Sequence, residues 1–155
     1  MNKVNIKLST LLFFVTTLMF MGCSDKAAKD SEEEGTPLEE AFQEISNIQG
    51  FEDWSKEAAE EYSGLGKVRA VIAPNSKARD KVLGILDEIP EELLCDEHRS
   101  GNNDKFIERY YIGKDADGES QMLYSVVGSG GADLFVILCS GADESKYRER
   151  VGKYK

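Results

Sequence analysis

Six consecutive apolar residues, Leu134 to Cys139, constrain the fold of this chain more than any other segment. Side chains of a β-strand point alternately to the two faces of its sheet, so a strand that is apolar at every position is buried on both sides. We therefore predict that residues 134–139 form a central strand of a sheet covered on both faces. The rest of the chain must supply the neighbouring strands and the cover.

The segments before this run predict a three-stranded meander that ends in it. Residues 106–112 and 121–127 are strand-like, and turn residues follow each of them. The first turn centres on Asp117-Gly118, a pair that favours tight hairpins because it adopts the positive φ angles they require. The second turn is the glycine-rich stretch 128–131. These three strands are the core of the predicted sheet.

Apolar residues at helical spacing predict helices on either side of a further strand. Thr36 is placed to cap the first helix, Pro37 fits its first turn, and Glu39 would complete a capping box. We expect helices at 37–49, 51–62, 77–89 and 144–150, and two more strands at 68–73 and 93–97.

The predicted fold class is α+β. The N-terminal helices and one β-α unit would pack on one face of a mainly antiparallel sheet, which ends in the three-stranded meander. Trp54 and Phe51 are expected to belong to the core beneath the helices.

A second constraint lies near the first residue, where a short apolar run ends at a cysteine. Lys3 and Lys7 precede residues 11–21, which are apolar except for two threonines. As a helix this run would reach about 16 Å, against a hydrocarbon core of roughly 30 Å, so it suits a cleaved signal better than a membrane span. The Gly22-Cys23 junction resembles the lipobox of bacterial lipoproteins. That resemblance implies cleavage before Cys23 and lipidation of its thiol; an ordinary secretory signal and an uncleaved anchor are the alternatives.

Three parts follow from this interpretation: a lipoprotein signal peptide at 1–22, an acidic flexible tether at 23–35 and a single globular domain at 36–155. From Cys23 to Gly66, 13 acidic residues against three basic ones give a net charge of −10. The remainder, with 16 acidic against 14 basic residues, is nearly balanced. Such acidity argues against nucleic acid as a partner, because phosphates require a basic footprint, and against adhesion to anionic lipid.

Cys95 and Cys139 are the remaining cysteines. Outside the cytoplasm an even pair invites a disulfide. The bridge would enclose about 44 residues and stabilise by roughly 4 kcal/mol in the chain-entropy model. The alternative is two buried free thiols, since free cysteine is among the most buried residue types. A bridge requires two strands with neighbouring Cα atoms.

No segment carries a catalytic, metal-binding or cofactor motif. The Cys-Asp-Glu-His stretch at 95–98 lacks the second Cys/His pair that a zinc site needs. The 115–118 turn lacks the end carboxylates of a calcium loop, and 128–131 lacks the following helix and lysine of a phosphate cradle. We expect no catalytic residue, no metal, no cofactor and no enzymatic activity, with a hydrolase that uses an unrecognised carboxylate pair as an alternative.

Three tyrosines are the candidate ligand contacts. Tyr110, Tyr111 and Tyr124 lie on neighbouring expected strands. Aromatic side chains on an open sheet can stack on sugars or apolar ligands. The alternative is that they pack beneath helices as part of the core.

The chain as a whole resembles small lipoproteins of Bacteroidota that carry a domain of unknown function. The resemblance rests on Gly22-Cys23, the acidic tether, the β-α unit 67–89 and the ending Leu134–Gly141. It implies a fatty-acylated protein, palmitate being a typical acyl chain, in the cell envelope and in its outer membrane. We expect a non-enzymatic binding or accessory module for an envelope protein partner or a small apolar ligand. A structural or assembly factor of an envelope complex is the other alternative.

Overall fold

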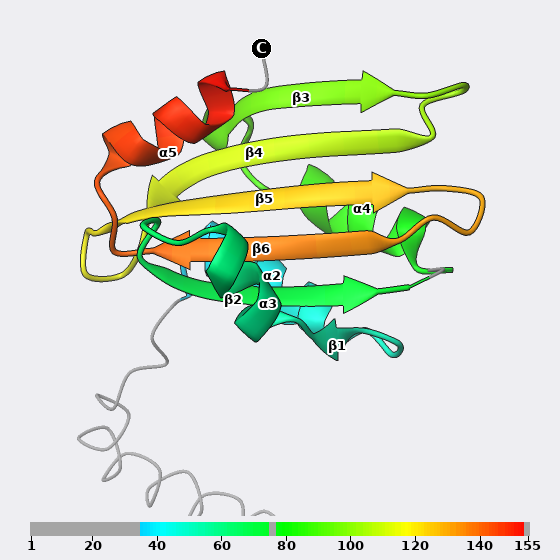
Figure 1. Cartoon of the computed structure of the whole chain (residues 1–155), viewed down its shortest axis with the longest axis horizontal. Coiled ribbons are helices and arrows are strands. Elements are labelled where there is room, and N and C mark those ends of the chain that lie inside the picture. The colour runs from blue at the N-terminus through cyan, green and yellow to red at the C-terminus, as the bar shows by residue number, and fades with distance from the viewer. Residues whose placement is uncertain (1–34, 75–76, 154–155) are drawn as a thin grey trace, which may run out of the picture. The chain divides into compact units, whose positions relative to one another are not determined.

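Six strands in a single antiparallel sheet organise the described part of the chain (Figure 1). A computed structural model describes residues 35–74 and 77–153, which belong to one unit. The predicted signal peptide, Cys23 and nearly all of the predicted tether lie outside the described residues. In chain order the elements are α2 (Pro37–Ser46), β1 (Glu52–Asp53), α3 (Ser55–Glu61), β2 (Lys67–Ala73), α4 (Arg79–Asp87), a 3-10 turn (Glu91–Leu93), β3 (Leu94–Ser100), β4 (Phe106–Lys114), β5 (Ser120–Gly128), β6 (Leu134–Ser140) and α5 (Glu144–Gly152).

The strand order β1-β2-β6-β5-β4-β3 confirms the α+β class and the meander of β4, β5 and β6. The apolar run Leu134–Cys139 is β6, which lies between β2 and β5, so it is an interior strand as predicted. The turn between β4 and β5 is closed by Asp115, whose carboxylate accepts backbone N–H groups of Asp117 and Glu119. Gly118 supplies the positive φ angle at this turn, +83°.

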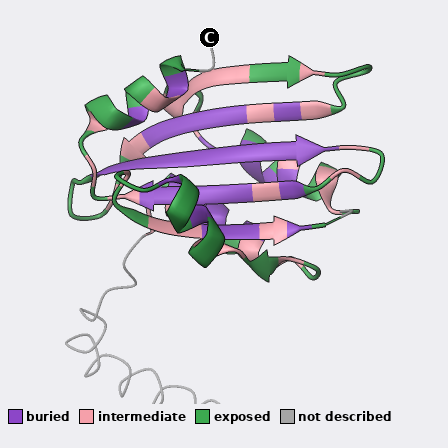
Figure 2. Cartoon of the chain, viewed as in Figure 1, coloured by how far each residue is buried: buried purple, intermediate pink, exposed green. Residues whose placement is uncertain are grey.

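Helices cover both faces of the sheet, which corrects the expectation of helices on one face. Alternate β6 residues explain the arrangement. Leu134, Val136 and Leu138 join the core beneath α2 and α4. Phe135, Ile137 and Cys139 join a second core beneath α3 and α5. We call these the α2/α4 face and the α3/α5 face. Buried residues run along the whole of β5 and most of β6 (Figure 2).

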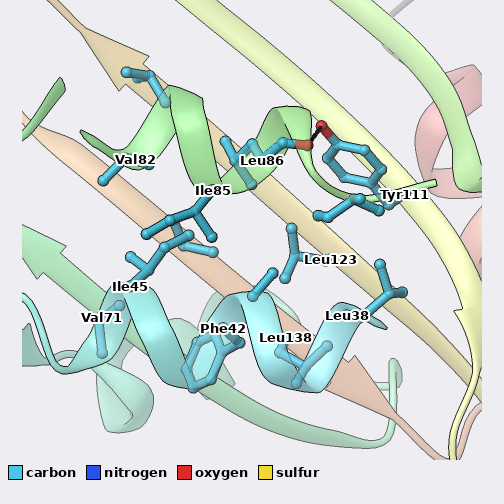
Figure 3. Packing of buried hydrophobic residues seen from close by; sticks show 14 of the residues in the cluster. Leu38, Phe42, Ile45, Val71, Val82, Ile85, Leu86, Tyr111, Leu123 and Leu138 are labelled. Carbon is cyan, nitrogen blue, oxygen red and sulfur yellow. Dashed lines mark hydrogen bonds between the residues drawn. The ribbon is translucent and has the colours of Figure 1, made fainter. Parts of the chain in front are cut away.

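The α2/α4 face carries the larger core (Figure 3). Each helix presents one apolar stripe to the sheet, at the spacing the sequence shows. Burying each large aliphatic side chain contributes about 1.5–3 kcal/mol, so these two stripes are a main source of stability. The stripes consist of Leu38, Ala41, Phe42 and Ile45 from α2 and Val82, Ile85 and Leu86 from α4.

The start of α2 differs from the predicted capping box. The Thr36 side chain makes no cap hydrogen bond to the helix. Its hydroxyl instead donates to Oε1 of Gln121 at 3.0 Å, a residue that is 1% exposed on β5. Glu39 pairs with Arg69 on β2 at 3.0 Å. Thr36 and Glu39 therefore bind partners on the sheet instead of backbone groups of their own helix. These two contacts attach the start of α2 to β5 and β2.

An ion-pair network ties the end of α4 to β3 and β4. The Arg109 side chain, 11% exposed, donates to Asp87 of α4 and to Glu97 of β3, each at 2.7 Å. Arg99 donates to the other oxygen of Glu97, also at 2.7 Å. Burial alone would raise the pKa of Glu97, but the hydrogen bonds from Arg99 and Arg109 outweigh it and lower that pKa below its ordinary value. The Glu97 carboxylate is therefore a stabilising group in its charged form.

We expect Glu97→Gln to lower the free energy of unfolding by about 1–2 kcal/mol at neutral pH, because two guanidinium groups lose a charged acceptor. A lowered folded pKa means that this contribution is present above the ordinary Glu value of 4.5 and is lost as the pH falls through the folded value. Denaturant unfolding followed by circular dichroism, at neutral and at acid pH, measures both effects. Glu88→Gln, an exposed carboxylate just after the same helix, is the control and should change little. Equal destabilisation by Glu97→Gln at both pH values would contradict the assignment.

Candidate functional site

Half of the α3/α5 face has no helix over it among the described elements. Figure 1 shows α3 in front of β2 and β6, and α5 in front of one end of β4, while the ends of the strands next to Ala73, Phe106 and Gly128 are bare. The two helices meet over the covered half, where Arg150 lies 3.8 Å from Glu61 and its guanidinium stacks over the Tyr62 ring. The other half is the candidate site.

One cross-strand row spans this open half from edge to edge. Residues directly opposite each other in an antiparallel sheet point to the same face. The observed registers therefore place six side chains in line, one from each strand. We call this the open row; it consists of Glu52, Ile72, Phe135, Val126, Glu108 and His98.

The open row is apolar at its centre and charged toward its ends. Ile72 and Phe135 are half-buried, and Val126 between Phe135 and Glu108 is 8% exposed. Glu52 and His98, on the two edge strands, are exposed. The half-buried ring of Trp54 lies 5.6 Å from that of Phe135, which extends the apolar centre toward α3. At the opposite corner Phe106 is half-buried, with the Lys105 ammonium 5.4 Å from its ring.

Tyr110 and Tyr124 form the floor beside the open row. Their rings stack at 4.3 Å with an interplanar angle of 10°, and they are 2% and 5% exposed. The Tyr124 hydroxyl donates to Oε1 of Glu108 at 3.1 Å. Burial, together with Tyr110 and the Glu108 charge, raises the pKa of Tyr124. Tyr124 therefore stays protonated and holds the Glu108 carboxylate in place at the row.

The three tyrosines predicted as ligand contacts do not lie on one face of the sheet. Tyr110 and Tyr124 share the α3/α5 face, but their stacked rings are covered, so they support the surface instead of presenting it. Tyr111 is on the opposite face, 2% exposed, where its hydroxyl donates to the carbonyl of Leu86 on α4 (Figure 3). This corrects its assignment as a ligand contact, because adjacent residues of one strand point to opposite faces.

The sequence alone did not identify the half-buried aromatic residues of the site. Phe106 and Phe135 were counted only as members of strands, and Trp54 only as core. The signal that could have found them is the register between strands, since Phe135 and Val126 pair directly and their strands are joined by a predicted hairpin. Registers beyond that hairpin, which bring Ile72 and Glu52 into line, depend on pairing between distant segments.

Cys95 and Cys139 are free thiols, the second of the two possibilities that the sequence left open. They lie on β3 and β6, and two strands separate them in the sheet. Three interstrand spacings amount to about 14 Å, whereas a disulfide needs Cα atoms within about 7 Å. Cys139 is fully buried, and burial raises the pKa of its thiol to about 12. Its thiol is therefore protonated and inert at neutral pH.

We expect iodoacetamide to alkylate Cys95 in the folded chain and to leave Cys139 unmodified until denaturant is added, because only Cys95 is partly exposed. Peptide mapping by mass spectrometry without reduction distinguishes the two sites. Cys95→Ser should abolish the labelling of the folded domain at these two positions. A linked Cys95–Cys139 peptide, or equal labelling of both thiols before denaturation, would contradict this expectation.

Three hollows of the described surface lie away from the open row. A cavity of about 310 Å³ separates α3 from α5 and is lined by Tyr62, Lys146 and Arg150 among others. Another, of about 470 Å³, lies where α2, β2 and α4 meet, and a smaller one of about 130 Å³ separates α2 from α4. Within residues 35–74 and 77–153, no three His, Cys, Asp or Glu side chains are placed to share a metal ion. The described helices include none long and apolar enough to span a bilayer.

Comparison with protein-family models, with curated proteins and with solved structures finds no match to this chain. The function of this protein is therefore inferred from the geometry of the site and from the sequence features at the start of the chain.

Proposed function

We propose that this protein is a lipid-anchored lipoprotein of the cell envelope, in the outer membrane, that acts as a non-enzymatic binding or accessory module. Its open row would be the contact surface for an envelope protein. The observation that carries this proposal is the half-buried apolar centre of the row, which continues the α3/α5 core to the surface without a helix over it. Apolar surface that is continuous with a core and left uncovered typically marks an interaction site.

A protein partner fits the row better than a small apolar ligand does. Small-molecule sites are concave and enclose most of their ligand. The three hollows described above are lined by other residues than those of the open row, so none of them supplies an enclosed site there. Part-exposed aromatic residues such as Trp54, Phe106 and Phe135 are the kind that dominate the centres of protein interfaces.

The anchor supports the same proposal. The sequence at Gly22-Cys23 predicts a lipidated amino terminus, and the acidic tether would hold the domain away from the membrane. A domain held in this way meets other envelope proteins at high local concentration, so a modest interface can be sufficient.

We expect a Cys23→Ala protein to lose its membrane partition, because the lipid is its proposed attachment. Detergent phase separation of natively produced protein measures this: the unchanged chain should enter the detergent phase, and Cys23→Ala the aqueous phase. Cys95→Ala is the matched control and should partition like the unchanged chain. Retention of Cys23→Ala in the detergent phase would contradict the lipid anchor.

We expect a photoreactive benzoylphenylalanine at position 106 to crosslink to an envelope protein in intact cells. The same group at Gln43, an exposed position on α2 of the opposite face, should not give that product. Adding Phe135→Glu should remove the product at position 106, because a charge at the centre of the row opposes its burial. Crosslinks of equal yield from both positions, or their persistence in Phe135→Glu, would contradict the proposed surface.

A further inference from the structure

We infer that the open row receives an amphipathic α-helix of a partner protein, with an apolar stripe flanked at both ends by lysine or arginine. This rests on the proposed function and goes beyond it by giving the conformation and the charge pattern of the occupant. Three observations carry it: the pairing of the strands beneath the row, its dimensions, and the charges at its margins.

At the apolar centre each strand beneath the row is paired on both sides. Ile72, Phe135 and Val126 lie on β2, β6 and β5, each of which pairs with a neighbouring strand on both sides. An extended segment lying on this face would leave its own N–H and C=O groups unpaired against apolar side chains, at considerable cost. A helix satisfies those groups internally. The covered half of the same face already follows this rule, since α3 and α5 pack there.

The dimensions of the row suit a helix of four to five turns. Six strands at roughly 4.8 Å spacing span about 24 Å, the length of about 16 helical residues. The apolar centre covers three adjacent strands, or about 10 Å, which corresponds to about two helical turns. An occupant with large apolar residues at i, i+3 or i+4, and i+7 would match Ile72, Phe135 and Val126.

The charged residues on either side of the apolar centre determine which charges the ends of that helix should carry. Glu52 on β1 is exposed, and Glu108 on β4 is held at the row by Tyr124. They stand four strands apart, or about 19 Å, which is about 13 residues of a helix. Basic residues before and after the apolar stripe would therefore meet carboxylates at both ends. Lys105 lies at the Phe106 corner and His98 at the β3 edge, so one margin also holds cationic or titratable groups.

The acidic residues beside the apolar centre also argue against a lipid membrane as the surface that binds the open row. Bacterial membranes with anionic lipid attract basic segments and repel acidic ones. The open row has a carboxylate on each side of its apolar centre, Glu52 and Glu108, which opposes insertion into such a surface. A protein helix is therefore the occupant that the charges favour, and a lipid surface is an outcome of the test.

Trp54 provides the measurement, because it is the single tryptophan of the chain and contacts Phe135. The full chain is titrated with two synthetic 18-residue peptides that share one apolar stripe and lack tryptophan, one with lysines at both ends and one with glutamates. Vesicles of phosphatidylethanolamine and phosphatidylglycerol are the third probe. We expect a saturable change in Trp54 emission with the lysine peptide, at least about tenfold tighter than with the glutamate peptide.

Substitutions locate the binding on the row. Phe135→Glu and Ile72→Glu should each weaken the lysine peptide about tenfold or more, and two positions guard against a folding defect in one of them. Glu52→Lys should weaken the lysine peptide and strengthen the glutamate peptide. Glu88→Lys, the same change beside α4 on the opposite face, should shift neither peptide.

Equal binding of both peptides, binding of neither, or a response to vesicles alone would overturn the inference. The crosslinking at position 106 separates its failure from that of the proposed function. If those crosslinks persist while the peptides fail, the surface stands and the basic-flanked helix is wrong. If the crosslinks are also absent, the proposed surface itself is wrong.

Discussion

The burial of β6 on both of its faces is the constraint on which the rest of this fold depends. A strand with apolar side chains at six successive positions is stable only when both faces are covered, and each buried large side chain contributes about 1.5–3 kcal/mol. The chain meets this requirement by placing β2 and β5 beside the strand and helices above and below it. The neighbouring strands then become interior as well, and their alternation sorts residues between two cores.

The two faces differ in how much of the sheet their helices cover. On the α2/α4 face two helices of ten and nine residues lie across the sheet and fit their apolar stripes together. On the other face α3 has seven residues, about 10 Å, and only Ala58 of that helix is buried. Such a helix cannot cover strands of seven to nine residues, which reach about 23–30 Å. The uncovered half-face therefore follows from the shortness of α3, together with the position of α5, whose nine residues pack over the other half of the same face.

Polar groups hold both surfaces in position. On the α2/α4 face, Arg109 joins Asp87 to Glu97 and fixes the end of α4 on the sheet. On the α3/α5 face, Tyr124 stacks on Tyr110 and donates to Glu108, so a carboxylate is kept at the margin of an apolar surface. Anchored charges of this kind favour one charge pattern in a partner over another, because a misplaced like charge is costly. The same side chains thus contribute to the stability of the fold and to the selectivity proposed for the row.

Local patterns in the sequence were sufficient for most elements and for the fold class. The exception is β1 (Glu52–Asp53), which lies inside the segment 51–62 that was predicted as one helix. Helical spacing identifies α2 and α4, the Asp-Gly turn identifies the β4–β5 hairpin, and the apolar run identifies β6, because each signal lies within a few neighbouring residues. The strand order, the side of the sheet on which each tyrosine falls, and the distance between Cys95 and Cys139 depend on pairing between segments far apart in the chain. The open row is the clearest case: Glu52 and His98 are at its two ends only because five registers agree. Sequence periodicity determines which residues are buried, whereas only the tertiary pairing decides which of them meet.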